Sequence, residues 1–156
     1  MRITKRRKSG VSVIIPTFNR ASYLYTTLLL LLNQKTGGNL QYEILVIDSG
    51  SDDTDKVIDF FSSQRPGIIT YRRIKNCRNR SLLRNTGAAL SQYDVFIFLD
   101  NDILVPPDFI RTHYDRQKET GHLVLLGRRR SLTSFSIRDI GEEAHRFQST
   151  GKAALV

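Results

Sequence analysis

Two carboxylates, Asp100 and Asp102, stand two residues apart directly after the strongly apolar stretch Val95–Leu99. Neighbouring carboxylates repel one another unless a cation lies beside them. Magnesium and manganese prefer oxygen ligands and are commonly shared between one or two carboxylates and the phosphates of a substrate. The pair therefore indicates a site for Mn²⁺ or Mg²⁺ with Asp100 and Asp102 as metal ligands. The alternative is that Asp100 only ends a strand and Asp102 caps a turn.

Arginine is the side chain whose planar fork best matches the phosphate oxygens that such a metal leaves free. Arg84 is the first candidate, because Asn85 and Gly87 beside it suggest close approach of a ligand to the backbone. Arg78 and Arg80 are alternates, and for all three the competing interpretation is a solvated charge on a helix. The chain has neither a Gly-x-Gly-x-x-Gly motif after its first strand nor a Gly-x-x-x-x-Gly-Lys-Ser/Thr motif, which argues against dinucleotide enzymes and P-loop phosphotransferases.

The elements that must position these residues alternate between short apolar runs and longer amphipathic stretches. The pattern predicts strands at Val11–Ile15, Glu43–Ile47, Ile68–Ile74, Val95–Leu99 and Leu123–Leu126. It predicts helices at Arg20–Gln34 with Asn19 as N-cap, at Thr54–Ser63, at Ser81–Gln92 and at Asp108–Glu119, and a weaker helix at Ile137–Phe147.

This alternation implies an α/β domain in which a mostly parallel central sheet is flanked by helices. In such sheets a ligand binds beyond the carboxyl ends of the strands, at the point where the strand order reverses. Polar residues follow three of the predicted strands there. They are Thr17 and Asn19 after the first strand, Asp48 after the second, and Asp100–Asp102 after the fourth.

Four stretches in this order and spacing resemble family 2 glycosyltransferases with the GT-A fold, a single Rossmann-like domain. They are VSVIIPTFNR at 11–20, EILVIDSGSD at 43–52, RNTGA at 84–88 and FLDNDILVP at 98–106. The resemblance covers about Val11 to Gly127. It implies binding of a nucleotide-diphosphate sugar, a UDP-sugar above all, and transfer of the sugar, typically a hexose, with inversion of the anomeric centre.

The resemblance also implies a role for each matching residue. The donor-binding residues would be Pro16, Thr17, Asn19, Asp48, Arg84, Asp100 and Asn101. Pro16 and Thr17 would line the base and ribose, while Asp48 would sit near the base. Arg84 would approach the base or the diphosphate. Asp100 and Asn101 would lie by the ribose and phosphates, and Asp102 would be the main metal ligand.

The chain departs from the family pattern at two points. An acidic residue that can contact the base often follows the position of Asp48, and here that residue is Ser49. An inverting transfer also needs a general base for the acceptor hydroxyl, which in the family lies well beyond the Asp-x-Asp. Glu142, Glu143 and His145 are the only titratable residues near the C-terminus that could serve as this base. We interpret them as residues on the surface of a helix, so the catalytic residue stays unknown.

Composition describes a single globular domain of 156 residues with 40% hydrophobic residues, one cysteine and a formal net charge of +9. We divide it into a basic arm at 1–10, a nucleotide-sugar-binding core at 11–127 and a C-terminal segment at 128–156 to which the pattern assigns no clear structure. Compared with the family, we expect the domain to be truncated at its C-terminus. The run Leu28–Leu32 is too short to span a membrane and is typical of a buried helix face. No signal peptide is recognisable, so we expect a cytoplasmic protein, with peripheral attachment to a membrane surface left open.

Three functions compete for this sequence. The first is metal-dependent glycosyl transfer to an unknown acceptor, such as a glycan, glycoprotein or lipid. The second is a donor-binding or assembly module without turnover, in which self-association covers exposed strand edges. The third is nucleic-acid binding driven by the positive charge, but the chain lacks a recognised nucleic-acid motif, so we expect no nucleic-acid partner.

Overall fold

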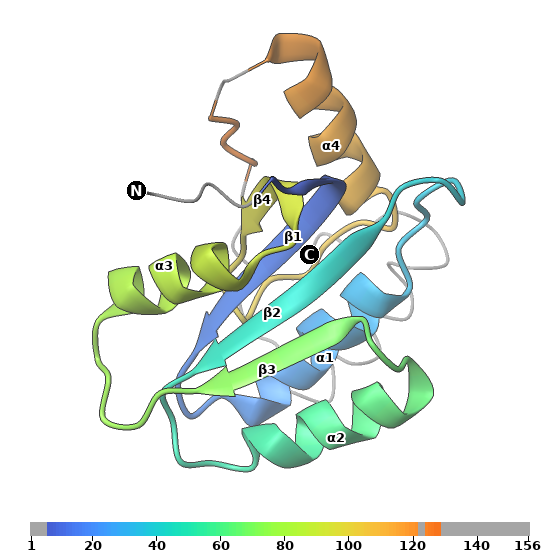
Figure 1. The fold of residues 1–156 in the computed structure, drawn as a ribbon. Helices are drawn as coiled ribbons and strands as arrows, with labels where there is room; N and C mark the ends of the chain where they lie inside the picture. The colour runs from blue at the N-terminus through green and yellow to red at the C-terminus, as the bar shows by residue number, and fades with distance from the viewer. Residues whose placement is uncertain (1–5, 122–123, 129–156) are drawn as a thin grey trace.

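The computed structural model describes residues 6–121 and 124–128, and in this part of the chain strands alternate with helices along the sequence (Figure 1). The strands are β1 (Lys8–Thr17), β2 (Tyr42–Asp48), β3 (Ile69–Arg73) and β4 (Tyr93–Phe98). The helices are α1 (Ala21–Leu32), α2 (Thr54–Gln64), α3 (Arg80–Leu90) and α4 (Phe109–Thr120).

The four strands form one parallel sheet in the order β3-β2-β1-β4. The chain first builds outward from β1 to β2 and β3, and then returns to place β4 on the other side of β1. The strand order therefore reverses between β1 and β4, which is where a doubly wound sheet opens a crevice for a ligand. Thr17 ends β1 and Asp48 ends β2, and the two residues are register partners.

Helices cover both faces of the sheet. On one face α1, α2 and α4 pack with alternate residues of β1 and β2 in the larger core, which includes Val13, Ile15 and Ile44. On the other face α3 packs through Leu83 on a smaller cluster. Gly87 lets α3 approach closely, because a Cβ at this position would collide with Ile14 of β1. The side chains of β1 and β2 are therefore buried on both faces, as parallel strands require.

The predicted α/β architecture and its parallel sheet are confirmed, and eight of the predicted elements appear with ends shifted by at most three residues. The strand predicted at Leu123–Leu126 is wrong for its described residues, since 124–126 form no strand. Val124 and Leu126 are 88% and 92% exposed, so this apolar run gains no burial without a neighbouring strand in the described part of the chain. Ile137–Phe147 lies outside the described residues.

Asn19 is not the N-cap of α1, contrary to prediction. The cap position belongs to Arg20, and Asn19 has a left-handed backbone with φ of 50°. The side chain of Asn19 accepts a hydrogen bond from the Ser51 amide at 2.7 Å, while the first amide of α1, at Ala21, donates to Asp52 at 2.8 Å. The loop after β2 therefore caps α1. A capping rule that considers only neighbouring residues cannot predict this contact, because Asp52 lies 31 residues after Ala21.

The leucine run lies within α1 as predicted, and Leu28, Leu30 and Leu31 are fully buried. This helix is buried almost all round because it packs on the sheet while α2 contacts another side of it. None of the helices described combines the length and the apolar character needed to cross a bilayer.

Candidate functional site

A pocket of about 490 Å³ opens at the carboxyl ends of the strands, a volume within the range of small-molecule sites. Five of the predicted site residues line it, namely Pro16, Thr17, Asp100, Asn101 and Asp102. Its other lining residues are Phe18, Arg20, Ser49, Cys77, Arg78, Arg80 and Leu83. Segments from β1, β2, α3 and β4, far apart in the sequence, therefore meet around one hollow.

Asn101 ties the end of β4 to the end of β1. Its side-chain amide donates to Thr17 Oγ1 at 2.7 Å, and its carbonyl accepts from Thr27 Oγ1 of α1 at 3.0 Å. Asn101 is only 7% exposed, whereas the side chains of Asp100 and Asp102 on either side are 46% and 37% exposed. The buried amide thus anchors the segment and leaves the two carboxylates accessible in the pocket.

Each of these carboxylates is paired with an arginine. Asp100 Oδ1 accepts from Arg84 Nη2 at 3.0 Å, and Asp102 Oδ2 accepts from Arg20 Nη1 at 2.7 Å. The guanidinium groups relieve the repulsion between two carboxylates held near each other. Because all four side chains are well exposed, each pair contributes at most about 1 kcal/mol to stability. A stronger ligand can therefore replace either arginine.

The donor set fits a hard divalent cation. Asp100 and Asp102 offer oxygen ligands at the rim of a pocket large enough to admit phosphates, which is the environment in which Mg²⁺ is usually held. Among the described residues, no three acidic, histidine or cysteine side chains lie together as a complete metal site. The remaining ligands would have to come from water or from phosphates of a bound substrate.

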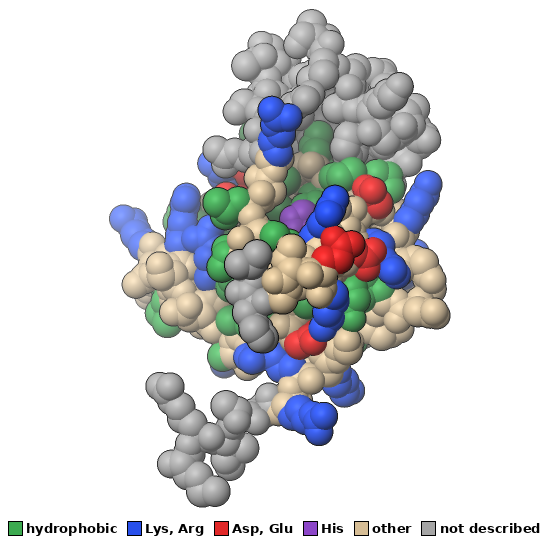
Figure 2. All heavy atoms as spheres, turned by 90° about the horizontal axis from the view of Figure 1, so that it is seen from above, with side chains coloured by type: hydrophobic (Ala, Val, Ile, Leu, Met, Phe, Trp, Pro, Cys, Tyr) green, Lys and Arg blue, Asp and Glu red, His purple; other side chains and the backbone are tan. Residues whose placement is uncertain are grey.

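Arg78 and Arg80 also line the pocket, on either side of Asn79, the N-cap of α3. Neither makes an ion pair with another residue in the described part of the chain. Figure 2 shows the molecule from above, on the side where Figure 1 has α4, and acidic side chains there lie beside basic ones. Within α4, Arg111 and Asp115 form an ion pair at 2.7 Å. Arg84, the first candidate for phosphate contact, does not line the pocket, while its two alternates do.

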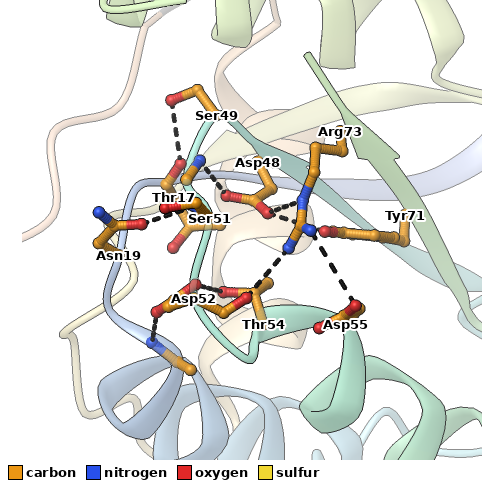
Figure 3. A network of polar contacts seen from close by, with 12 residues as sticks. Thr17, Asn19, Asp48, Ser49, Ser51, Asp52, Thr54, Asp55, Tyr71 and Arg73 are labelled. Atoms are coloured by element: carbon orange, nitrogen blue, oxygen red, sulfur yellow. Dashed lines mark hydrogen bonds and ion pairs between the residues drawn. The ribbon is translucent and has the colours of Figure 1, made fainter. Parts of the chain in front are cut away.

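Asp48 lies at the centre of a polar network that joins β2 to β3 (Figure 3). It is fully buried, and its carboxylate accepts from the Gly50 amide at 2.7 Å, Tyr71 Oη at 2.7 Å and Arg73 Nε at 2.8 Å. Burial of the Tyr71 phenol, and then its hydrogen bond to Asp48, raise the pKa of Tyr71. Asp48 does not line the pocket, but the next residue, Ser49, does.

The same network fixes the loops that follow β1 and β2. Asn19 holds the amide of Ser51, and Gly50 lies so close that a Cβ on it would collide with Asn19. Ser49 donates its amide to the carbonyl of Thr17 at 3.0 Å. Asn19 therefore joins the two loops instead of lining the pocket, and the joined loops present Thr17 and Ser49 to it.

Sequence reasoning did not assign a role to Arg20, Phe18, Leu83 or the thiol of Cys77, all of which line the pocket. Arg20 stands directly after Asn19 at the carboxyl end of β1, so its position could have been noticed. Its orientation could not, because its partner Asp102 lies 82 residues further along the chain.

Comparison with known proteins gives this fold and site their context. The model of the family "Glycosyl transferase family 2" matches residues 12–150. The poly(ribitol-phosphate) beta-N-acetylglucosaminyltransferase TarP of Staphylococcus aureus (strain N315) is 33% identical over 119 residues, which cover 76% of this chain and 36% of TarP. The chain thus spans about a third of the length of this curated relative.

Solved structures share the architecture. The crystal structure of S. aureus TarS 1-349 superposes with a TM-score of 0.61 at 19% identity, covering 70% of this chain and 32% of that one. The mannosyltransferase PcManGT from Pyrobaculum calidifontis, in complex with GDP-Man and Mn²⁺, gives a TM-score of 0.58 at 19% identity over 73% of this chain and 35% of that one. The expected GT-A fold is confirmed. With a family model that matches most of its length, the chain belongs to glycosyl transferase family 2.

Proposed function

We propose that this chain forms the donor-binding part of an inverting, metal-dependent glycosyltransferase that takes a sugar from a nucleotide diphosphate, UDP first. The observation that carries the proposal is the anchored Asp100–Asn101–Asp102 segment. It stands where the strand order reverses and presents two carboxylates to the pocket that Arg78 and Arg80 line. Carboxylates for a cation and free guanidinium groups for phosphates are what a metal-bound diphosphate needs.

Asp102, together with Asp100, would hold the Mn²⁺ or Mg²⁺ ion. When bound, this ion would neutralise the charge that develops on the diphosphate leaving group. PcManGT, which shares the fold, was solved with GDP-Man and Mn²⁺. Arg78 and Arg80 would bind the phosphate oxygens. Arg80 is the first residue of α3 and Arg78 precedes its N-cap, so both lie at the amino end of the helix, which favours negative charge.

The nucleoside would lie along Pro16, Thr17 and Ser49. Thr17 already uses its hydroxyl to accept from Asn101, so it would position the segment as well as line the ribose. Asp48 would act through Ser49, because its own carboxylate is buried and fully hydrogen-bonded. TarS was also solved in complex with UDP-GlcNAc, which supports a UDP-sugar as the first donor to test.

The acceptor hydroxyl needs a general base in an inverting transfer. Among the described residues that line the pocket, Asp100 and Asp102 are the only acids, and we assign both to the metal. Glu142, Glu143 and His145 lie outside the described residues. The alternative function is a donor-binding or assembly module that self-associates without turnover. Separate assays of donor hydrolysis and sugar transfer distinguish the two, since donor binding without either reaction would exclude transfer by this chain.

Calorimetric titration with UDP, GDP and other nucleoside diphosphates, each with and without Mn²⁺, tests donor binding. We expect Mn²⁺ to tighten binding of one nucleotide, and Asp102→Asn to abolish this gain by removing a charged ligand. Asp115→Asn is the matched control, because Asp115 also pairs with an arginine at 2.7 Å but lies on α4, outside the pocket lining. An Asp102→Asn protein with the full gain from Mn²⁺ would refute the metal role.

A further inference from the structure

Arg20 and Asp102 face each other across the mouth of the pocket. Arg20 Nη1 lies 2.7 Å from Asp102 Oδ2, both residues line the pocket, and their side chains are 51% and 37% exposed. Arg20 comes from the loop after β1 and Asp102 from the segment after β4. The pair therefore bridges the two strands between which the sheet order reverses.

The backbone on both sides of this pair is held in place. Asn19 and Ala21, which flank Arg20, are bound to Ser51 and Asp52, and Asn101, which precedes Asp102, is bound to Thr17. The guanidinium of Arg20 lies 5.6 Å from the centre of the Tyr23 ring, at the distance of a cation–π contact. Any change at this pair is therefore a movement of side chains, and the long arginine can swing while its backbone stays fixed.

A divalent cation that binds Oδ2 of Asp102, alone or together with Oδ1, competes with Arg20 for that oxygen. A magnesium-sized ion sits about 2.1 Å from a carboxylate oxygen, so a guanidinium kept at its present distance would be pressed against a doubly charged ion. The ion pair is exposed, and exposed pairs of this kind are weak. A cation that binds Oδ2 of Asp102 therefore displaces Arg20.

In the pocket, a phosphorylated ligand would supply an anionic partner for the displaced guanidinium. Arg78 and Arg80 line the same pocket and would repel it, whereas a diphosphate would add negative charge between the three arginines. We propose that Arg20 competes with the cation for Asp102 and becomes a donor-phosphate ligand once the metal binds. This inference rests on the proposed function, and in it Arg20 exchanges Asp102 for a phosphate of the donor.

The exchange predicts that Arg20→Gln changes the affinities for Mn²⁺ and for UDP in opposite directions. Without nucleotide, Mn²⁺ binding should tighten roughly two- to fivefold, because the competing guanidinium is gone. At saturating Mn²⁺, UDP binding should weaken about tenfold, since a charge-assisted hydrogen bond is lost. Without Mn²⁺, UDP binding should change little, because Arg20 is then engaged with Asp102 in the wild type.

Electron paramagnetic resonance of free Mn²⁺ measures the first affinity, and calorimetry with UDP measures the other two. Arg20→Lys keeps the charge and should recover part of the UDP affinity, while Arg111→Gln removes an arginine from a matched pair on α4 and should change none of them. Circular dichroism checks that each variant is folded.

Two outcomes separate this inference from the proposed function. If Asp102→Asn leaves Mn²⁺ binding intact, the metal site itself is misassigned and both ideas fall. If Asp102→Asn abolishes Mn²⁺ binding but Arg20→Gln weakens UDP equally with and without Mn²⁺, or not at all, the partner exchange is overturned while the metal site stands.

Discussion

Arg78 and Arg80 differ from Arg20, the other basic residue of the pocket lining, because they have no acidic partner among the described residues. We expect Arg78→Gln and Arg80→Gln each to weaken UDP binding about tenfold while leaving uridine binding unchanged, because a nucleoside has no phosphates to meet the guanidinium fork. Calorimetry with the two ligands gives the comparison.

Arg65→Gln is the matched control for these two variants. Arg65 also makes no ion pair to a described residue, but it precedes β3, at the opposite end of the sheet from the pocket. An Arg65→Gln protein that loses as much UDP affinity would show that the effect comes from overall charge and not from the pocket.

The sequence allowed Asp100 and Asp102 to be singled out because their signal is local, two acids directly after an apolar strand. Which arginine lines the pocket could not be predicted from its neighbours in the sequence. Arg84 seemed best from its neighbours, yet it pairs with Asp100, while Arg78 and Arg80 line the pocket. A helix turns its residues through all directions, so which of several arginines faces a ligand depends on how the helix packs.

Between elements, the side chains of Tyr71 and Arg73 in β3 both donate hydrogen bonds to the buried carboxylate of Asp48 in β2. Tyr71→Phe removes one of its donors and should lower the free energy of unfolding by about 1–3 kcal/mol at pH 7. Urea unfolding followed by circular dichroism measures this change. Tyr93→Phe, whose hydroxyl contacts no described hydrogen-bond partner, should cost much less.

The loss of stability caused by Tyr71→Phe should depend on pH. Folding raises the pKa of Tyr71 above its ordinary value of 10, through burial and then the hydrogen bond to Asp48. The stability due to the neutral phenol is therefore fully present below pH 10 and is lost as pH rises from there through the folded pKa. The gap between wild type and Tyr71→Phe should narrow above pH 10, and a constant gap up to pH 11 would contradict the assignment.

Element types and their order could be predicted because buried parallel strands read as apolar runs and the helices as amphipathic stretches. The failures concern contacts made between elements. Asn19 looked like a cap for the helix that follows it, but Asp52 caps that helix from another loop. The strand expected at Leu123–Leu126 was a short apolar run, and it has no partner strand among the described residues.

At the scale of the whole molecule, the formal net charge of +9 should attract any nucleotide anion. We expect the affinity for UDP to fall roughly three- to tenfold between 50 and 500 mM NaCl, because salt screens exposed charges. Uridine affinity should stay nearly constant over the same range. Fluorescence competition at each salt concentration measures both.

This salt series also tests the nucleic-acid alternative. A protein that binds nucleic acid through its charge would bind a single-stranded oligonucleotide strongly at low salt, and its affinity would fall steeply as the salt concentration rises. We expect no saturable binding of the oligonucleotide at 50 mM NaCl. Displacement of UDP by the oligonucleotide at that concentration would make the positive charge, and not the pocket, the main determinant of binding.

The hydrogen bond between Thr17 and Asn101 spans 84 positions of the chain, and the pair of Arg20 with Asp102 spans 82. Contacts of such high contact order form slowly, because a long loop must close before they contribute. The chain must therefore dock its fourth strand beside its first before any binding site exists. Nucleotide binding would then appear late in refolding, after most helical signal has returned, and would report that the sheet is complete.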